Sequence, residues 1–123
     1  MLKVKTSIRL SPIHGLGLFA AETIRKGQLI WTYDPDQDSK VSADESAQFT
    51  ESRKATLHHF AYRSDQGYWI LCGDGALFIN HSDEPNCERL FHDPEFPNSR
   101  EPVTRAMRDI KPGEELTTRY LEP

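Results

Sequence analysis

Asn80 and His81 are the first candidates for ligand binding in this chain of 123 residues. They directly follow an apolar Leu-Phe-Ile run at 77–79 and precede a Pro-Asn turn at 85–86. Polar side chains at the end of an apolar run lie at the edge of the core, where buried polar groups need hydrogen-bond partners. Two interpretations are open from the residues alone: a polar cluster that ties a turn, or side chains that bind a ligand.

A pair of glycines near the start indicates a second kind of chemistry, the close approach of backbone to a bound group. Gly15 and Gly17 alternate with Leu16 after His14 and lead into a short apolar segment. Glycine permits positive φ and places no side chain in the way. A tight turn is the alternative, because an isolated Gly-x-Gly pair is weak evidence of binding.

The histidines and cysteines do not predict a metal site. Cys72 and Cys87 are the only cysteines, too few for a disulfide framework or a four-thiolate zinc site. No pair has the spacing of a zinc finger, and adjacent His58 and His59 would point in different directions on a helix. We therefore expect no metal, and the cysteine usage favours a reducing, intracellular location.

Composition restricts the classes of partner. The net charge is -4, which argues against general nucleic-acid binding and is compatible with a basic partner such as a Lys-rich peptide. The acidic 34–45 segment could steer such a partner through Asp34, Asp36, Asp38, Asp44 and Glu45. No run approaches the ~18 apolar residues of a membrane span, and residues 1–10 lack the apolar segment of a signal peptide.

Many short strands and one main helix must position these residues. Alternation from Val4 to Leu10 predicts a strand with one solvent-exposed face. Further short strands are predicted after the glycine pair and near 29–33, 68–72, 103–110 and 116–120. A helix is expected within 44–61, because Ser42 and Glu45 have the spacing of a capping box, with a break near Thr50. The chain is thus predicted to be one mostly-β, α+β domain over residues 1–123.

Two segments of the chain resemble each other. Residues 24–30 and 110–116 both read Ile, basic, any residue, Gly, Gln or Glu, any residue, aliphatic. Ala20 and Ala106 precede them at the same distance. We interpret this as two similar turn-strand units and not as a long repeat array.

In order along the chain, several stretches resemble the SET domain, the fold of most protein lysine methyltransferases. The stretches that carry the resemblance are Gly15-Leu16-Gly17, Phe78-Ile79-Asn80-His81-Ser82, Pro85-Asn86 and Gly113-Glu114-Glu115-Leu116-Thr117-Thr118-Arg119-Tyr120. The resemblance covers nearly the whole chain. It implies a β-clip-like fold of short strands and small sheets with a knot-like C-terminal segment. That segment would bring Asn80 and His81 together with Tyr120.

The resemblance also implies an activity, the transfer of a methyl group from S-adenosylmethionine to a lysine amine. By this resemblance the residues that bind the cofactor are His14, Gly15, Leu16, Gly17, Asn80 and His81. Tyr120 is the expected catalytic residue, with a C-terminal aromatic that fills the core as the alternative. Tyr33, Tyr62 and Thr118 are expected to wall the substrate channel, although core packing would equally account for Tyr62.

Three positions depart from the family pattern. Asp83 stands where many members carry a zinc-binding Cys, Thr118 where they often have Phe or Tyr, and Arg119 where they usually have Asp. The lid over the substrate must then come from the 92–102 loop, a partner subunit in a homodimer, or the substrate. A catalytically weak SET-like module that binds basic peptides is the alternative function.

Overall fold

Short strands in small sheets build the part of the chain that the computed structural model describes, residues 1–64, 67–97 and 101–120. An antiparallel hairpin pairs β1 (Thr6–Leu10) with β2 (Leu16–Ala20). Two three-stranded antiparallel sheets have the orders β3 (Leu29–Thr32), β9 (Val103–Ala106), β8 (Cys87–Leu90) and β4 (Ser39–Val41), β6 (Trp69–Leu71), β5 (Tyr62–Arg63). The fourth sheet pairs β7 (Asn80–His81) with β10 (Thr117–Thr118) in parallel.

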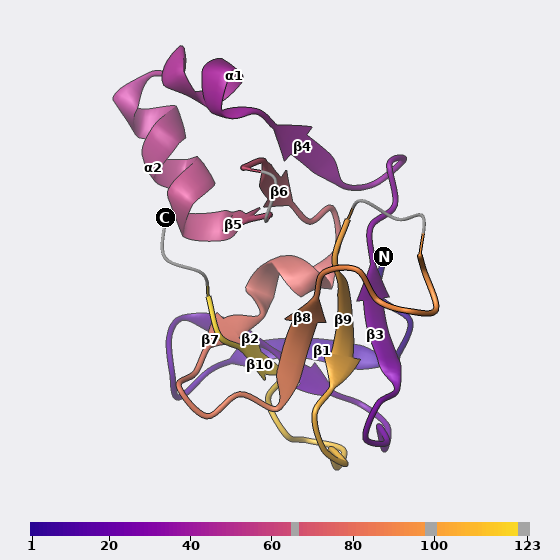
Figure 1. Cartoon of the computed structure of the whole chain (residues 1–123). Coiled ribbons are helices and arrows are strands. Elements are labelled where there is room, and N and C mark those ends of the chain that lie inside the picture. Colours follow the sequence, from indigo (N-terminus) through magenta and orange to yellow (C-terminus); the bar gives the residue numbers. More distant parts are fainter. Residues whose placement is uncertain (65–66, 98–100, 121–123) are drawn as a thin grey trace.

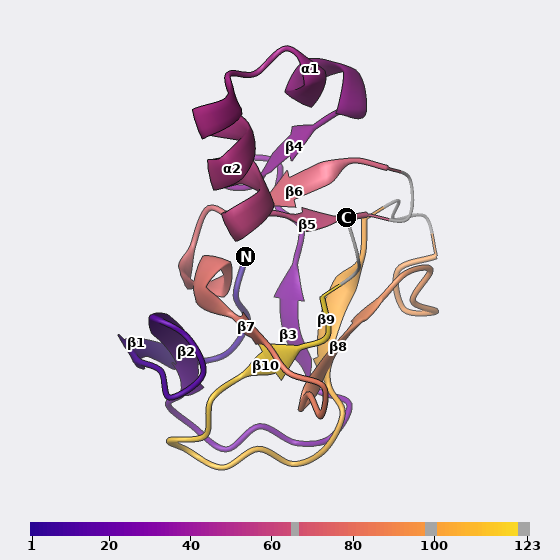
Figure 2. The ribbon, with the colours of Figure 1, turned by 90° about the vertical axis from the view of Figure 1, so that its left-hand side faces the viewer.

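The helices gather at one end of the molecule. Helices α1 (Ala43–Ala47) and α2 (Glu51–Phe60) lie beside the β4–β6–β5 sheet (Figure 1). The short 3-10 helix η1 (Gly75–Phe78) leads into β7. Figure 2 shows the β1–β2 hairpin to one side of the β3–β9–β8 sheet, with β7 and β10 between them. The mostly-β, α+β class predicted from the sequence is confirmed.

Helix capping follows the sequence closely. The Ser42 side chain accepts from the Glu45 backbone N–H at 3.0 Å, and the Glu45 carboxylate accepts from the Ser42 N–H at 3.3 Å. The helical segment then breaks, and α2 starts again with Thr50 as its N-cap, accepting from Arg53 N–H at 3.2 Å. Both predictions, the capping box and the break, are confirmed, because the capping geometry is local.

One core connects the sheets. Its fully buried aliphatic members come from strands and turns throughout the chain: Leu18, Ile24, Ile30, Ile70, Ile110 and Leu116. Trp31 lies among them, with the Tyr62 ring edge-on at 6.1 Å between centroids. Burial of such side chains supplies most of the driving force for folding. Since this core lies between the sheets, it fixes the relative positions of β2, β7 and β10.

The two similar units pair directly with each other through backbone hydrogen bonds. Ile24 and Ile110 exchange backbone hydrogen bonds of 2.8 and 2.7 Å. Gly27 donates to the Ala106 carbonyl, and Gly113 donates to the Ala20 carbonyl, both at 2.8 Å. The two glycines have φ of 85° and 91°, a region that favours glycine. The similarity read from the sequence therefore corresponds to a local pseudo-two-fold arrangement.

Two details differ from the sequence-based expectations. In β1, Ser7 to Leu10 are all exposed, including 46% of Ile8 and 82% of Leu10, so the prediction of a single exposed face is wrong. The partner strand β2 covers the core in its place. The strand expected over 103–110 ends at Ala106, because the chain then turns to bring Ile110 to Ile24. Among the helices of the described residues, none has the length and apolar character that crossing a membrane requires.

Candidate active site

Strand β10 brings the end of the described chain to His81. Thr117 and Thr118 pair with Asn80 and His81 in the parallel sheet. Beyond β10, the Tyr120 backbone N–H donates to Nδ1 of His81 at 2.9 Å, and the Tyr120 hydroxyl donates to the Ile79 carbonyl. The expected meeting of Asn80, His81 and Tyr120 is therefore present in the structure.

The contacts of His81 define its tautomer. Nδ1 accepts from the Tyr120 N–H, so the ring proton lies on Nε2, which donates to the Asp83 carboxylate at 3.0 Å. Asp83 thus orients the imidazole at the position where the family pattern has a cysteine. The imidazole in turn fixes the backbone that carries the Tyr120 ring, which lies 5.3 Å from it between centroids.

Asn80 holds the glycine turn in shape. Its side-chain Nδ2 donates to the carbonyls of His14 at 3.1 Å and Leu16 at 3.2 Å, and to the Glu115 carboxylate at 2.9 Å. The residue is buried, with 8% of its surface exposed. The first interpretation made from the sequence, a polar side chain that ties a turn, is therefore confirmed for Asn80. The turn also borders a cavity, and ligand binding by Asn80 stays a prediction.

Glu115 is a site residue that sequence reasoning missed. Both of its carboxylate oxygens accept from the Ser11 hydroxyl, at 2.8 and 2.9 Å, and one also accepts from Asn80. A Cβ added at Gly17 would lie 2.5 Å from the Glu115 Oε2, so glycine permits this approach without a shift of the carboxylate. The sequence signal that could have identified Glu115 is its position directly before Leu116, inside a stretch that carries the family resemblance.

The larger of two neighbouring cavities has a volume of about 570 Å³ and is bordered by this turn. Its walls include Ile13 to Leu16, Asn80, His81 and Tyr120, together with the C-terminal turn of α2. Volumes of 300–1,000 Å³ with mostly apolar walls and a few polar groups are typical of small-molecule sites. Five of the six predicted cofactor residues line this cavity; Gly17 lies behind its wall, against Glu115.

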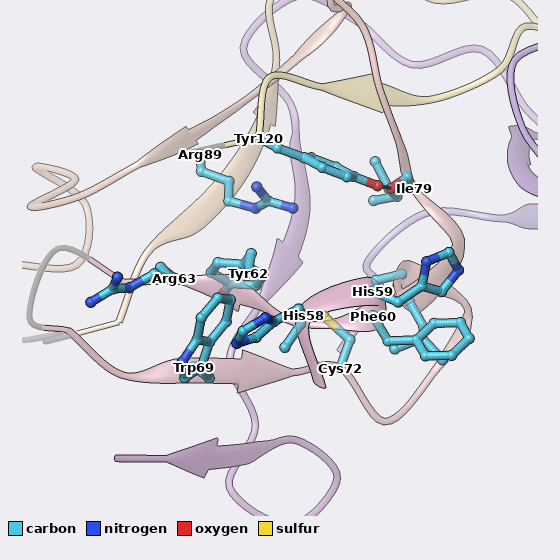
Figure 3. Close-up of a pocket in the computed structure, with 13 residues that line it drawn as sticks. His58, His59, Phe60, Tyr62, Arg63, Trp69, Cys72, Ile79, Arg89 and Tyr120 are labelled. Carbon is cyan, nitrogen blue, oxygen red and sulfur yellow. Dashed lines mark hydrogen bonds between the residues drawn. The ribbon is translucent and has the colours of Figure 1, made fainter. Parts of the chain in front are cut away.

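A smaller cavity of about 110 Å³, drawn in Figure 3, shares part of its lining with the larger one. It is bordered by the rings of Tyr62, Trp69 and Tyr120, and His58 stacks on Trp69 at 4.7 Å. Both cavities are lined by His58, His59, Phe60, Leu77 and Tyr120. Tyr120 therefore borders both cavities, and its hydroxyl bonds to the Ile79 carbonyl on the smaller one.

Burial keeps the tyrosine hydroxyls and the thiol of this smaller cavity protonated. It raises the pKa values of the Tyr62 and Tyr120 hydroxyls, while the nearby Arg89 guanidinium opposes both shifts. Desolvation also raises the pKa of the Cys72 thiol to about 12. The Arg89 guanidinium lies 4.0 Å from the Tyr62 ring centroid, and burial lowers its pKa. Neither Arg89 nor Trp69 was singled out from the sequence, because no local pattern distinguishes them.

The remaining predicted channel residues lie outside the walls of the two cavities. Tyr33 packs edge-on against Trp31 at 6.5 Å and lies 5.8 Å from the Lys40 ammonium. Thr118 is buried, and its hydroxyl has no partner among the described residues. Channel roles for these two residues, and the catalytic and binding roles of the others, stay predictions. Residues 98–100 of the proposed lid loop lie outside the described part.

The acidic segment needs one correction. Asp38 was expected to steer a basic partner, yet it is buried, with 5% exposed. Its carboxylate accepts from the backbone N–H groups of Asp34 and Gly73, both at 2.8 Å. Because its carboxylate accepts hydrogen bonds inside the fold, Asp38 stabilises the structure and does not face a partner. Within the described residues, no group of three or more His, Cys, Asp or Glu side chains is arranged to hold a metal ion.

Comparison with known proteins identifies the fold family. The family model described as "SET domain" matches residues 15–121. The human protein named histone-lysine N-methyltransferase 2B is 32% identical over 123 residues, which is 98% of this chain and 4% of that protein. The Schizosaccharomyces pombe protein named histone-lysine N-methyltransferase, H3 lysine-4 specific, is 35% identical over 117 residues, 92% of this chain and 12% of that protein.

A solved structure agrees with these matches. It is a humanized mutant of the Chaetomium thermophilum Polycomb Repressive Complex 2 bound to the inhibitor GSK126, with a TM-score of 0.69 and 25% identity. The alignment covers 94% of this chain and 15% of that chain. The chain therefore spans only a small part of these relatives, over the region that forms their shared domain. It follows from the matched model, the relatives and the architecture that this chain belongs to the SET domain family.

Proposed function

We propose that the chain is an S-adenosylmethionine-dependent methyltransferase that acts on the side-chain amine of lysine in a basic protein. The observation that carries the proposal is the position of Tyr120 in the wall shared by two cavities. One cavity has a volume in the range of small-molecule sites, and the other is smaller and bordered by aromatic rings. A methyl donor in the larger cavity and an acceptor amine in the smaller one would meet beside Tyr120, which lines both cavities.

The residues of the larger cavity suit the cofactor. Gly15, at φ 47°, has open space where a Cβ would stand, so backbone lines this part of the cavity. Ile13 and Leu16 are 51% and 45% exposed and line this cavity, as expected for residues that a flat ring could cover. Asn80 Nδ2 is fully used by the protein, which leaves its Oδ1 as the atom available to accept from an adenine amino group.

When bound, S-adenosylmethionine supplies a methyl group activated on a positively charged sulfur. The Tyr120 hydroxyl donates its hydrogen bond to the Ile79 carbonyl, which leaves the lone pairs of the hydroxyl oxygen free. They can accept weak C–H hydrogen bonds from a polarised methyl group. Because its pKa is raised, Tyr120 stays neutral at physiological pH. Most of the remaining catalysis is positioning, which the Asn80 and His81 networks provide.

The aromatic cavity suits the aliphatic stem of a lysine. Rings of Tyr62 and Trp69 exclude water, and such an environment lowers the pKa of an entering amine. The human and Schizosaccharomyces pombe relatives are named histone-lysine N-methyltransferases, which supports histone-like basic proteins as the substrate class. Such a substrate implies an intracellular location. A homodimer that completes the lid, and the absence of direct nucleic-acid binding, stay predictions.

The test is methyl transfer from isotope-labelled S-adenosylmethionine to histones and to an H3 N-terminal peptide, read by mass spectrometry. The proposal predicts a labelled methyl group on a lysine side chain. The proposal would be contradicted if calorimetry shows that the cofactor binds, but no lysine of histones or of other basic proteins from the source cell becomes labelled. That result would favour the alternative, a catalytically weak SET-like module that binds basic peptides, which the departures from the family pattern at Thr118 and Arg119 favour.

A further inference from the structure

Arg89 places a positive charge in the cavity proposed for the acceptor side chain. Its guanidinium carbon lies 4.0 Å from the Tyr62 ring centroid and 5.8 Å from that of Tyr120. Figure 3 shows the side chain reaching from β8 toward these two rings. Nη1 is buried and has no hydrogen-bond partner among the described residues. A cation thus already occupies the aromatic surface on which a substrate ammonium would have to lie.

Nothing in the described lining of this cavity neutralises the charge. The other titratable or charged side chains that face it are His58 and His59 from α2, Tyr62 and Arg63 from β5, Cys72 after β6, and Tyr120. None of these is a carboxylate, and burial raises the pKa of Tyr62, Cys72 and Tyr120, so they stay uncharged near neutral pH. An uncompensated buried charge acts strongly on a second charge placed near it.

We propose that Arg89 makes this cavity selective for an uncharged side chain, so that it admits the neutral amine of lysine and excludes the ammonium ion. The inference rests on the proposed function, which takes this cavity as the acceptor channel. A like charge within a few ångströms disfavours the charged form of an amine. The neutral amine alone has the lone pair that attacks carbon, so its proton passes to solvent before entry. Arg89 is thereby a specificity-determining residue, distinct from Tyr120.

The test uses two probes with the four-carbon stem of lysine, uncharged 1-butanol and n-butylammonium. Each is titrated into the chain at about pH 8 and followed by NMR at the Trp69 indole N–H. We expect 1-butanol to bind at least about tenfold more tightly, because the guanidinium repels the cation in a low dielectric. In Arg89→Met the preference should fall to less than about twofold, and in Arg89→Lys, which restores the charge, it should return.

Arg63→Met is the matched control. Arg63 also lines the cavity, and its guanidinium carbon lies 5.4 Å from the Trp69 ring centroid, but Figure 3 shows its side chain extending away from Tyr62 and Arg89, so its loss should leave the preference unchanged. Arg89→Gln replaces Arg89→Met if thermal melting shows that the latter is unfolded. Equal binding of both probes to the unmutated chain, a preference that survives loss of Arg89, or no response of Trp69 to either probe would each overturn the inference.

These outcomes are separate from those of the proposed function. A chain that discriminates between the probes through Arg89, yet transfers no methyl group, would refute the proposed reaction and leave the charge selectivity of the cavity standing. A chain that methylates lysine but binds both probes equally would refute the role of Arg89 alone.

Discussion

The backbone N–H of Tyr120 donates to Nδ1 of His81 across 2.9 Å. This bond joins the end of the described chain to a residue 39 positions earlier and fixes the tautomer of the imidazole. The same histidine donates from Nε2 to Asp83 at 3.0 Å. The His81 side chain thus positions Tyr120, which borders both cavities. His81 was also one of the two first candidates for ligand binding in the sequence.

Asn80→Ala should weaken cofactor binding. The substitution removes the donor to the carbonyls of His14 and Leu16 and to the Glu115 carboxylate, so the turn at 14–16 loses its anchor. Buried polar groups left unpaired cost about 1–3 kcal/mol. We expect a lower melting temperature and a dissociation constant for S-adenosylhomocysteine raised by about tenfold, measured by calorimetry.

Asn80→Asp is the matched control for this variant. It keeps the shape of the side chain but places a carboxylate oxygen against the two carbonyls and the Glu115 carboxylate. It should therefore weaken cofactor binding at least as much as Asn80→Ala does. An Asn80→Ala chain that binds S-adenosylhomocysteine as tightly as the unmutated chain would show that the turn holds its shape without Asn80.

Gly17→Ala and Gly15→Ala should destabilise the chain for different reasons. At position 17 the new Cβ would lie 2.5 Å from the Glu115 Oε2 and force that carboxylate away from Ser11. Overpacking of this kind costs about 1–3 kcal/mol. At position 15 there is open space, but φ is 47°, so alanine costs about 1–2 kcal/mol of backbone strain.

Asparagine separates the two causes, since it tolerates positive φ better than alanine does. Gly15→Asn should recover part of the stability measured in urea, whereas Gly17→Asn should be worse than Gly17→Ala. Equal effects of asparagine at both positions would refute the distinction.

The fold should lose stability at alkaline pH because of its thiols. Burial raises the pKa of both Cys72 and Cys87 from 9.0 to about 12. Between these values the unfolded chain has released its thiol protons while the folded chain retains them. The free energy of unfolding therefore falls as pH rises, by up to about 1.4 kcal/mol per pH unit for each thiol.

Urea denaturation from about pH 8 to 10 would measure this slope. The double variant Cys72→Ala, Cys87→Ala should show a shallower fall above pH 9.0. Because burial also raises the pKa of Tyr62, its hydroxyl lowers the free energy of unfolding further, but only above pH 10.0. An identical slope in the double variant would mean that the thiols ionise equally in both states.

Local signals predicted much of the fold and part of the site. The Ser42–Glu45 capping box, the break at Thr50 and the matched Gly27 and Gly113 turns depend on residues close in sequence, and they appear as expected. The ordered stretches around Asn80 and Tyr120 carried the family resemblance.

What could not be predicted depends on contacts between distant residues. Glu115 meets Ser11 across 104 positions, and Asp38 is buried because it caps backbone groups 4 and 35 positions away. Arg89 faces Tyr62 only because β8 and β5 come to border one cavity. No spacing in the sequence encodes such meetings, so these roles became visible only in three dimensions.

The most direct test of the account is Tyr120→Phe, assayed for both methyl transfer and cofactor affinity. Removing the hydroxyl removes the acceptor placed beside the wall between the cavities, while the His81 bond to the Tyr120 backbone and the ring packing remain. The account predicts a loss of transfer rate of roughly 10²-fold or more, with S-adenosylhomocysteine bound as before. Methyl transfer at the unmutated rate would contradict it.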